Sequence, residues 1–326
     1  MRRQPIIVLT VCLLAASPGC SALRTIFGSD GGYLFEGYDC LAVPGREVEV
    51  KVRLLSGSLL RDRTDVPVRF KQAGRPLGEI RTDGEGFATV PFTPPAPGDY
   101  VVSAEVPPEG LKTGPPAPTE VLVACRAPAV PIVIVDLDKT LVASGFKTVL
   151  VGDPPPMPHS TEVMRRLARD FTVVYLSHRL DYFGPKSKAW LRRHVYPRGP
   201  VLLAGVRDFF KGSGEFKTEV LEQLRRLFKG RMIGIGDQVS DALAYRANGL
   251  EAFLIPPVEE PDNPDSLRDL ARELEPLPDD VQVVTGWNEI AKAIYDGWCY
   301  PRSAFQDNLL SRAERLEQTE RTGKNP

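Results

Sequence analysis

The pattern of hydrophobic and polar residues changes near residue 130. Residues 46–54 alternate strictly between polar and apolar side chains, which predicts a strand with one face on a core. Short runs of similar character follow, separated by turn-rich segments, at 66–71, 77–81, 87–92, 100–106 and 121–124. Closely spaced short strands of this kind predict an antiparallel β-sandwich over residues 45–126, joined by a short connector to a second domain.

Beyond residue 130 the apolar runs are continuous. Residues 132–135, 171–176, 232–235 and 252–255 predict strands that are buried on both faces. Apolar residues at helical spacing predict a helix that begins at Lys217 and further helices at 266–274 and 287–295. A second domain is therefore expected over residues 131–300. A C-terminal helix and tail should occupy 301–326, fraying from Arg312 onward.

The N-terminus has the pattern of a secretory signal. Arg2 and Arg3 precede an apolar run at 6–16, and small residues follow up to Ala22. The run is too short to cross a bilayer, and a buried N-terminal strand or helix is the alternative. Residues 17–20 also resemble a bacterial lipoprotein processing site, in which Cys20 becomes lipidated. We expect residues 1–22 to direct export to the periplasm or cell envelope, with or without this anchor, and residues 23–44 to form a linker.

Export bears on the cysteines, because thiols outside the cytosol can form disulfides. Cys40 lies just before the first predicted strand of the sandwich, and Cys125 lies just after the last one. A bridge between them would close the ends of this module, and two independent buried thiols are the alternative.

Composition excludes several classes of protein. Lys and Arg total 41 against 42 for Asp and Glu, so the net charge of −1 gives no overall field for nucleic acid, and none is expected as a partner. Hydrophobic residues make up 42% and charged residues 25% of the chain, which argues against a disordered chain and a multi-span membrane protein.

The most informative polar residues follow the strand at 132–135. This apolar run ends in Asp136-Leu137-Asp138-Lys139-Thr140. Ligands of open α/β sheets bind at the carboxyl ends of strands. Two carboxylates so close to a buried strand need a cation nearby, since an unpaired buried charge costs several kcal/mol. A solvated turn is the alternative interpretation of the same residues.

Four motifs in order resemble the haloacid dehalogenase superfamily of phosphotransferases. The first is the D-x-D-x-T run from Asp136 to Thr140. The second is Ser177 after the strand at 171–176, and the third is Lys217 at the start of a helix. The fourth is the G-D-x-x-x-D run at 236–241. The resemblance implies a Rossmann-like α/β domain with a parallel sheet.

The resemblance also implies a Mg²⁺-dependent phosphomonoester hydrolase. Asp136 would attack phosphorus and form an aspartyl-phosphate. Asp138 would protonate the leaving oxygen and later deprotonate water. Repulsion between the nucleophile and the phosphate would be relieved by Mg²⁺. Its expected ligands are Asp136, Asp237, Asp241 and the backbone carbonyl of Asp138.

Further residues are expected to bind the substrate. The resemblance implies that Ser177 donates a hydrogen bond to a phosphoryl oxygen and that Lys217 balances the charge. Thr140, which ends the first motif, is expected to bind the substrate as well. Lys211 is the rival for the role of Lys217, but it lies in a Gly-Ser-Gly loop. Arg179 is the best further candidate, because its guanidinium fork matches phosphate oxygens.

Within this superfamily, residues 132–255 resemble the catalytic domain of lipin-type phosphatidate phosphatases. The similarity rests on the runs at 175–179, 197–203, 216–219 and 244–246. It implies phosphatidate or a similar lipid phosphate as the leading substrate, and a membrane surface as a partner. His178 departs from that family, which commonly has Ala there. His178 could assist at the site or make a structural hydrogen bond. Related domains in phosphatidylinositol-transfer proteins have lost catalytic acids and only bind lipid, but both Asp136 and Asp138 are present here.

The spacing of the first two motifs leaves no room for a large cap, because only 36 residues, 141–176, separate them. An uncapped site can accept a bulky phosphomonoester. A phosphatase for soluble or protein-borne phosphates and a lipid-phosphate-binding protein without turnover are the alternative functions.

Two further features leave alternatives open. The sandwich resembles bacterial immunoglobulin-like or prealbumin-like modules, for which a spacer role and a recognition role are both open. Trp287, Trp298 and Tyr300 could contact a membrane interface or pack in the core.

Overall fold

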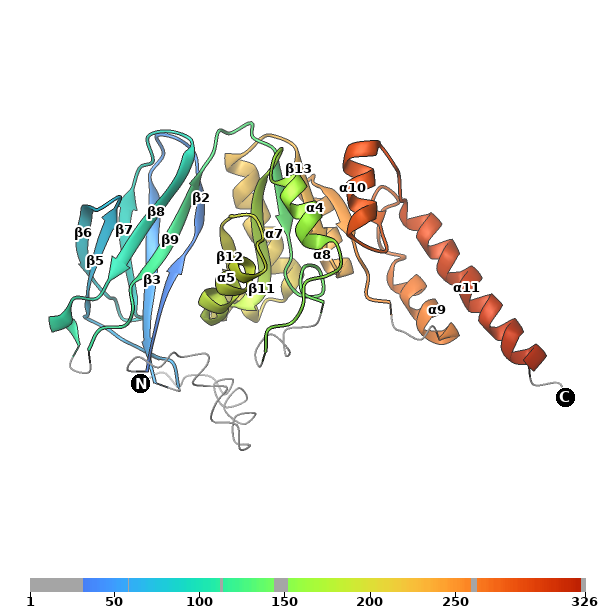
Figure 1. Cartoon of the computed structure of the whole chain (residues 1–326), viewed down its shortest axis with the longest axis horizontal. Coiled ribbons are helices and arrows are strands. Elements are labelled where there is room, and N and C mark those ends of the chain that lie inside the picture. The colour runs from blue at the N-terminus through green and yellow to red at the C-terminus, as the bar shows by residue number, and fades with distance from the viewer. Residues whose placement is uncertain (1–31, 58, 112–113, 144–151, 259–262, 324–326) are drawn as a thin grey trace.

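A computed structural model describes residues 32–57, 59–111, 114–143, 152–258 and 263–323. Figure 1 shows a β-sandwich beside an α/β domain, with the long C-terminal helix at the far end of the molecule. The predicted signal segment 1–22, including Cys20, lies outside the described residues.

The first domain is a sandwich of two β-sheets. One sheet contains β1 (Tyr33–Tyr38), β3 (Val48–Ser56), β4 (Arg61–Asp62) and β7 (Phe87–Phe92). The other has the order β2 (Cys40–Ala42), β9 (Thr119–Cys125), β8 (Gly98–Glu105), β5 (Pro67–Gln72) and β6 (Arg75–Arg81). The alternation along β3 buries Val50, Val52 and Leu54 in the core between the sheets. The predicted sandwich is confirmed.

Two details of the sandwich were predicted wrongly. The expected linker over residues 23–44 contains β1 and β2 in its second half. Strand β1 lacks clear alternation because Leu34, Phe35 and Glu36 are all buried, as expected for a strand that is covered on both faces. Strand β2 pairs with β9 in parallel, whereas the sandwich was expected to be antiparallel throughout.

The structure has Cys40 and Cys125 as free thiols. In the parallel pair, Cys40 lies opposite Val123 and Cys125 lies opposite Ala42. This offset of two residues along neighbouring strands separates the two Cα atoms by about 8 Å. A disulfide cannot span that distance without movement of the backbone.

The second domain is built on a six-stranded sheet in which all neighbouring strands are parallel. The order of its strands is β12 (Val201–Ala204), β11 (Thr172–Leu180), β10 (Ile132–Val135), β13 (Met232–Gly236), β14 (Glu251–Leu254) and β15 (Gln282–Val283). Strands β10 and β13 are buried along their whole length. Hydrophobic clusters lie on both faces of the sheet, which explains the continuous apolar runs. The predicted α/β fold is confirmed.

Helices flank this sheet (Figure 1). They are α4 (Ser160–Leu167), α5 (Gly184–Arg193), α6 (Val206–Phe209), α7 (Ser213–Leu227), α8 (Val239–Ala247), α9 (Pro264–Glu273), α10 (Trp287–Asp296) and α11 (Arg302–Gly323). Two short 3₁₀ helices, η1 (Pro108–Gly110) and η2 (Asp181–Phe183), lie in connections. Within the described part of residues 141–176, α4 is the one helix, in keeping with a minimal cap.

Three boundaries differ from the sequence predictions. Helix α7 begins four residues before Lys217. Strand β11 continues past Ser177 to Leu180, with an irregularity in its pairing to β12 after Ser177. Helix α11 runs through Arg312 because Leu309 and Ala313 are buried in a core cluster that α9 shares.

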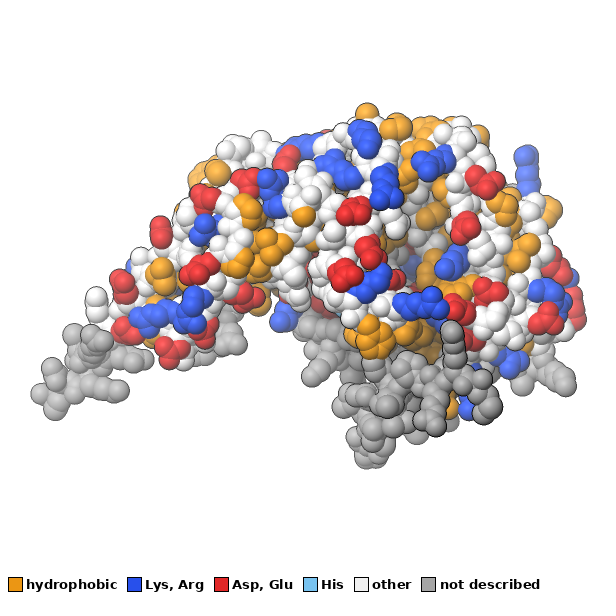
Figure 2. Space-filling view, turned by 180° about the vertical axis from the view of Figure 1, so that it is seen from behind, with side chains coloured by type: hydrophobic (Ala, Val, Ile, Leu, Met, Phe, Trp, Pro, Cys, Tyr) orange, Lys and Arg blue, Asp and Glu red, His pale blue; other side chains and the backbone are white. Residues whose placement is uncertain are grey.

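The aromatic residues near the C-terminus divide between core and surface. Trp287 is 1% exposed and packs in the core, whereas Trp298 is 58% exposed and stacks on Tyr300. Among the described residues, no helix combines the length and apolar character needed to cross a membrane. Figure 2 shows Lys and Arg side chains interspersed with Asp and Glu on the face it presents.

Candidate active site

Three aspartates meet at the carboxyl edge of the parallel sheet. Asp136 follows β10 directly, and Asp237 follows β13, which is the neighbour of β10 in the sheet. Asp241 lies in the first turn of α8, which starts just after Asp237. One carboxylate oxygen from each aspartate lies within 4.8 Å of the others, and all three residues are buried. The sheet therefore gathers side chains that are about a hundred residues apart in the chain.

Lys217 is the cation that contacts this cluster. Its Nζ atom lies 3.0 Å from Asp136 Oδ1 and 2.7 Å from Asp241 Oδ1, and its side chain is 2% exposed. Burial lowers the pKa of Lys217, but the carboxylates of Asp136 and Asp241 outweigh burial and raise this pKa above its ordinary value. Lys217 is therefore charged at neutral pH. The rival Lys211 lies at the surface and pairs with Asp208 and Glu219.

The carboxylates carry more negative charge than Lys217 can balance. Burial, partly offset by Lys217, raises the pKa of Asp136 to about 6. Burial together with the charges of Asp136 and Asp241 raises the pKa of Asp237 to about 8. Without a further positive charge, the cluster resists full ionisation near neutral pH.

The cluster fits a Mg²⁺ ion. All three groups offer carboxylate oxygens, which are the ligands that Mg²⁺ prefers. Asp241 Oδ2 is buried without a hydrogen-bond partner among the described residues. A Cβ atom at Gly236 would lie 2.6 Å from this oxygen, so glycine is needed for the approach. Asp136, Asp237 and Asp241 would hold the ion. The expected carbonyl ligand of Asp138 stays a prediction.

Asp138 makes an ion pair that the sequence did not indicate. Arg179 donates from Nε and Nη2 to the two carboxylate oxygens of Asp138, at 2.7 and 2.8 Å. Its Nη1 atom donates to Ser187 Oγ at 3.0 Å. The Arg179 side chain is 2% exposed, whereas that of Asp138 is 23% exposed. A buried guanidinium thus fixes the orientation of a carboxylate that solvent can reach.

A cavity of about 300 Å³ lies over these groups. Its lining consists of Asp136, Asp138, Lys139, Ser177, His178, Arg179, Phe209, Ser213, Lys217, Asp237, Gln238 and Asp241. Most of the residues predicted for the site therefore line one cavity. Direct contact of Ser177 or Arg179 with a phosphate stays a prediction.

Thr140 is the exception, because the structure does not bring it to the cavity. It is completely buried, and its Oγ1 atom has no hydrogen-bond partner among the described residues. Trp287 Nε1 donates to the Thr140 carbonyl at 2.9 Å. Lys139 has a φ of 53°, a left-handed conformation that turns the chain here. Lys139 lines the cavity, whereas Thr140 lies in the core.

Several residues of the cavity were missed in the sequence. Ser213 Oγ donates to Asp241 Oδ1 at 3.3 Å, from the N-terminal turn of α7. The exposed Phe209 stacks on His178, with ring centroids 4.9 Å apart, and burial lowers the pKa of His178. Gln238 was visible within the fourth motif, but Ser213 and Phe209 lie in segments without a motif.

The comparisons with known proteins agree with this site. Residues 133–255 match the family model for the LNS2 domain of PITM 1-3. This LNS2 match covers less than half of the chain, lies inside the α/β domain and contains the aspartates and Lys217 described above. This part of the chain is therefore similar to an LNS2 domain. No curated protein matches the sequence.

Solved structures match the sandwich only at a coarse level. A D00-D0 domain structure of intimin is 20% identical, with a TM-score of 0.21, and the match covers 29% of this chain and 48% of that one. The M4 domain of titin is 13% identical, with a TM-score of 0.22, over 30% of this chain and 100% of that one. The CARDB domain of the PF1109 protein from Pyrococcus furiosus is 19% identical, with a TM-score of 0.20, over 29% and 92%.

Proposed function

We propose that this protein is a Mg²⁺-dependent phosphomonoester hydrolase that acts through an aspartyl-phosphate on Asp136. The observation that carries the proposal is the meeting of three buried carboxylates with Lys217, beside the separately held carboxylate of Asp138. A cluster of carboxylates with excess negative charge can bind a cation, and the carboxylate of Asp138, which lies outside that cluster, can transfer protons.

In the first step, a carboxylate oxygen of Asp136 forms a bond to phosphorus and the bond to the leaving oxygen breaks. Asp138 donates a proton to that oxygen. In the second step, Asp138 takes a proton from water, the water oxygen attacks phosphorus, and Asp136 is released together with inorganic phosphate. Bound Mg²⁺ would supply positive charge against the phosphate oxygens. Lys217 would hold Asp136 in position and share that task.

The leading substrate is phosphatidate or a similar phosphomonoester of a lipid. The LNS2 match supports a lipid-related role, and the short connection between the first two motifs leaves the site open to a bulky substrate. Export and anchoring through Cys20 belong to the same proposal, because they would place the enzyme at a membrane surface.

A lipid-phosphate-binding role without turnover is the second candidate. The matched family model is that of a PITM domain, and such domains bind lipid where catalytic acids are missing. In this chain both Asp136 and Asp138 line the cavity, which favours turnover.

The test is a phosphate-release screen with the full chain. Vesicles containing phosphatidate, soluble sugar phosphates, nucleotides and a phosphopeptide would be compared in Mg²⁺ and in EDTA. We expect Mg²⁺-dependent release that is fastest from the vesicles. Release from soluble or peptide substrates alone would favour the alternative phosphatase. Vesicle binding without any release would favour the binding protein.

A further inference from the structure

Buried polar contacts join the β-sandwich to the segment that follows Arg179. We call this group the interdomain clamp; it consists of Tyr38, Asp39, Arg53, Asp181 and Lys188. The first three lie on or beside strands β1 and β3 of the sandwich, and the last two lie in η2 and α5 of the α/β domain. Asp39 and Asp181 are buried, and Tyr38 is half-buried at the end of β1.

The first part of the clamp surrounds Asp181. Tyr38 donates a hydrogen bond from Oη to Asp181 Oδ2 at 2.8 Å, and Arg53 Nη1 lies 3.9 Å from the same oxygen. Asp181 is only 3% exposed. A carboxylate at this depth is costly unless it keeps its partners, so the sandwich holds η2 in a defined position.

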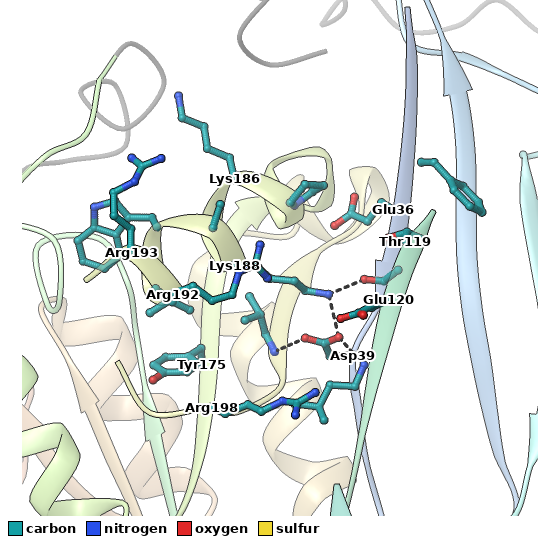
Figure 3. Close-up of a pocket in the computed structure, with 18 of the residues that line it drawn as sticks. Glu36, Asp39, Thr119, Glu120, Tyr175, Lys186, Lys188, Arg192, Arg193 and Arg198 are labelled. Carbon is teal, nitrogen blue, oxygen red and sulfur yellow. Dashed lines mark hydrogen bonds and ion pairs between the residues drawn. The ribbon is translucent and has the colours of Figure 1, made fainter. Parts of the chain in front are cut away.

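The second part of the clamp surrounds Lys188. Its Nζ atom donates to the carbonyl of Gly37 at 2.7 Å and to Asp39 Oδ1 at 2.8 Å. Asp39 Oδ2 in turn accepts from the backbone N–H of Val201 in β12, at 3.1 Å. Figure 3 shows Lys188 reaching from α5 toward Asp39 at the wall of a groove of about 1270 Å³ between the domains.

The two domains also touch at the start of α5. A Cβ atom at Gly184 would overlap the carboxylate of Glu36 in β1. Burial and the charge of Asp181 raise the pKa of Glu36 well above its ordinary value, so its surroundings disfavour the charged form. The close approach leaves little freedom for α5 to move against the sandwich.

The clamp lies next to the groups that hold Asp138. Asp181 is two residues after Arg179, and Lys188 directly follows Ser187. Ser187 Oγ accepts a hydrogen bond from Arg179, and Arg179 donates two hydrogen bonds to the carboxylate of Asp138. The sandwich therefore fixes both chain segments that orient the Arg179 guanidinium.

We infer that the β-sandwich is a positioning element of the active site, and that Tyr38 and Lys188 are positioning residues that act through Arg179 on Asp138. The inference rests on the proposed function for the role of Asp138 as proton donor. A general acid has to lie within hydrogen-bond reach of the leaving oxygen, and small displacements reduce its effect. The sandwich thus has a task beyond that of a spacer.

The dependence of the reaction rate on the leaving group distinguishes a positioning role from a purely structural one. An alkyl phosphate such as dioctanoyl phosphatidate needs a proton on its leaving oxygen, whereas p-nitrophenyl phosphate has a stable leaving anion and needs little help. Displacement of Asp138 should therefore slow the first substrate far more than the second. The value of kcat/KM is measured for both, because it reports on the first phosphoryl transfer.

The test variants are Tyr38→Phe, Lys188→Met and their combination in the full chain. Arg126→Gln is the matched control, because Arg126 Nε donates to Thr172 Oγ1 at 3.2 Å, across the same domain boundary but at the opposite end of β11. For the double variant we expect kcat/KM for the alkyl phosphate to fall about tenfold, and less than threefold for p-nitrophenyl phosphate. Arg126→Gln should leave the ratio of the two values unchanged.

Hydrogen exchange of residues 177–188 is measured in parallel, because it does not depend on turnover. Exchange should be faster in the double variant than in wild type and Arg126→Gln. An equal fall of both kcat/KM values, or an unchanged ratio, would overturn the inference. If wild type releases no phosphate from either probe, the proposed function fails, and unchanged exchange in the double variant would then separately overturn the positioning role.

Discussion

In the part of the chain that the structure describes, buried carboxylates gather in two places, and the positive charge around them differs. At the sheet edge, Asp136, Asp237 and Asp241 share a single contacting cation, Lys217, among the described residues. At the domain boundary, Asp39 pairs with Lys188 and also accepts backbone hydrogen bonds.

The second boundary carboxylate is only partly paired, because Asp181 Oδ1 is buried without a hydrogen-bond partner among the described residues. Asp181 has Tyr38 as a donor and Arg53 nearby, while the remaining acid, Glu36, has its pKa raised by burial. Two cations, Lys188 and Arg53, thus lie against the boundary acids, whereas one contacts the three aspartates of the sheet edge. This difference favours a structural role for the first group and the proposed bound cation for the second.

The largest expected effect comes from one isosteric substitution in each of the two groups of carboxylates, because the two substitutions should differ greatly in their effect on activity. Asp136→Asn removes the nucleophile and should lower phosphate release by about 10⁴-fold or more. Asp39→Asn, the equivalent change at the boundary, should keep at least about a tenth of the activity, because it disturbs only positioning. Release assays on both variants, with circular dichroism to verify folding, test this contrast. Comparable activity of Asp136→Asn and wild type would rule out the mechanism.

The next effect concerns the cation of the cluster. Lys217→Met removes the charge that contacts Asp136 and Asp241, and kcat should fall by about 10²-fold or more. Lys211→Met is the control, since Lys211 lies at the surface and should change kcat less than twofold. If the Lys211 variant loses more activity than the Lys217 variant, Lys211 and not Lys217 is the lysine that acts at the site.

The third effect lies at the domain boundary. Gly184→Ala would press a Cβ atom against Glu36 and should lower the free energy of unfolding by about 1–3 kcal/mol. The change Gly84→Ala is the control, because a Cβ at Gly84 would meet nothing within 4 Å. Urea unfolding measures both. Adding Glu36→Ala should relieve the Gly184→Ala defect, and a failure of that rescue would mean that the contact is not the cause.

The last effect, small for each pH unit, is a dependence of stability on pH in EDTA. Because the pKa of Asp237 rises from its ordinary value of 3.8 to about 8 on folding, the folded protein binds more protons than the unfolded chain between these values. Stability should therefore fall as pH rises from 4 to 8, and Asp237 alone can contribute at most about 1.4 kcal/mol per pH unit. Thermal unfolding measures this slope.

Mg²⁺ should remove that dependence, because the ion stabilises the ionised carboxylates. The increase in Tm on adding Mg²⁺ should be larger at pH 8 than at pH 5. Asp237→Asn should flatten the slope in EDTA, and an unchanged slope in this variant would assign the effect to another group.

Local sequence determined the two domains and most of the candidate site. The alternation at 46–54 and the continuous run at 132–135 reflect different burial, on one face and on both faces of a sheet. Asp136 and Asp237 could be found because each directly follows a buried strand, and carboxyl ends of parallel strands meet at one edge.

Only the tertiary structure decided which polar groups meet across long stretches of chain. Strand β1 was missed because its second face is covered by the other domain, which removes the alternation that marks a strand. The pairing of Arg179 with Asp138 joins residues 41 positions apart, and Tyr38 meets Asp181 across 143 positions. Such contacts depend on how domains and loops pack, and a linear pattern contains no information on a partner that far away. The sequence therefore determined the edge of the sheet where the aspartates meet, whereas the packing of the sandwich against α5 decided the contacts around the segments that flank Arg179.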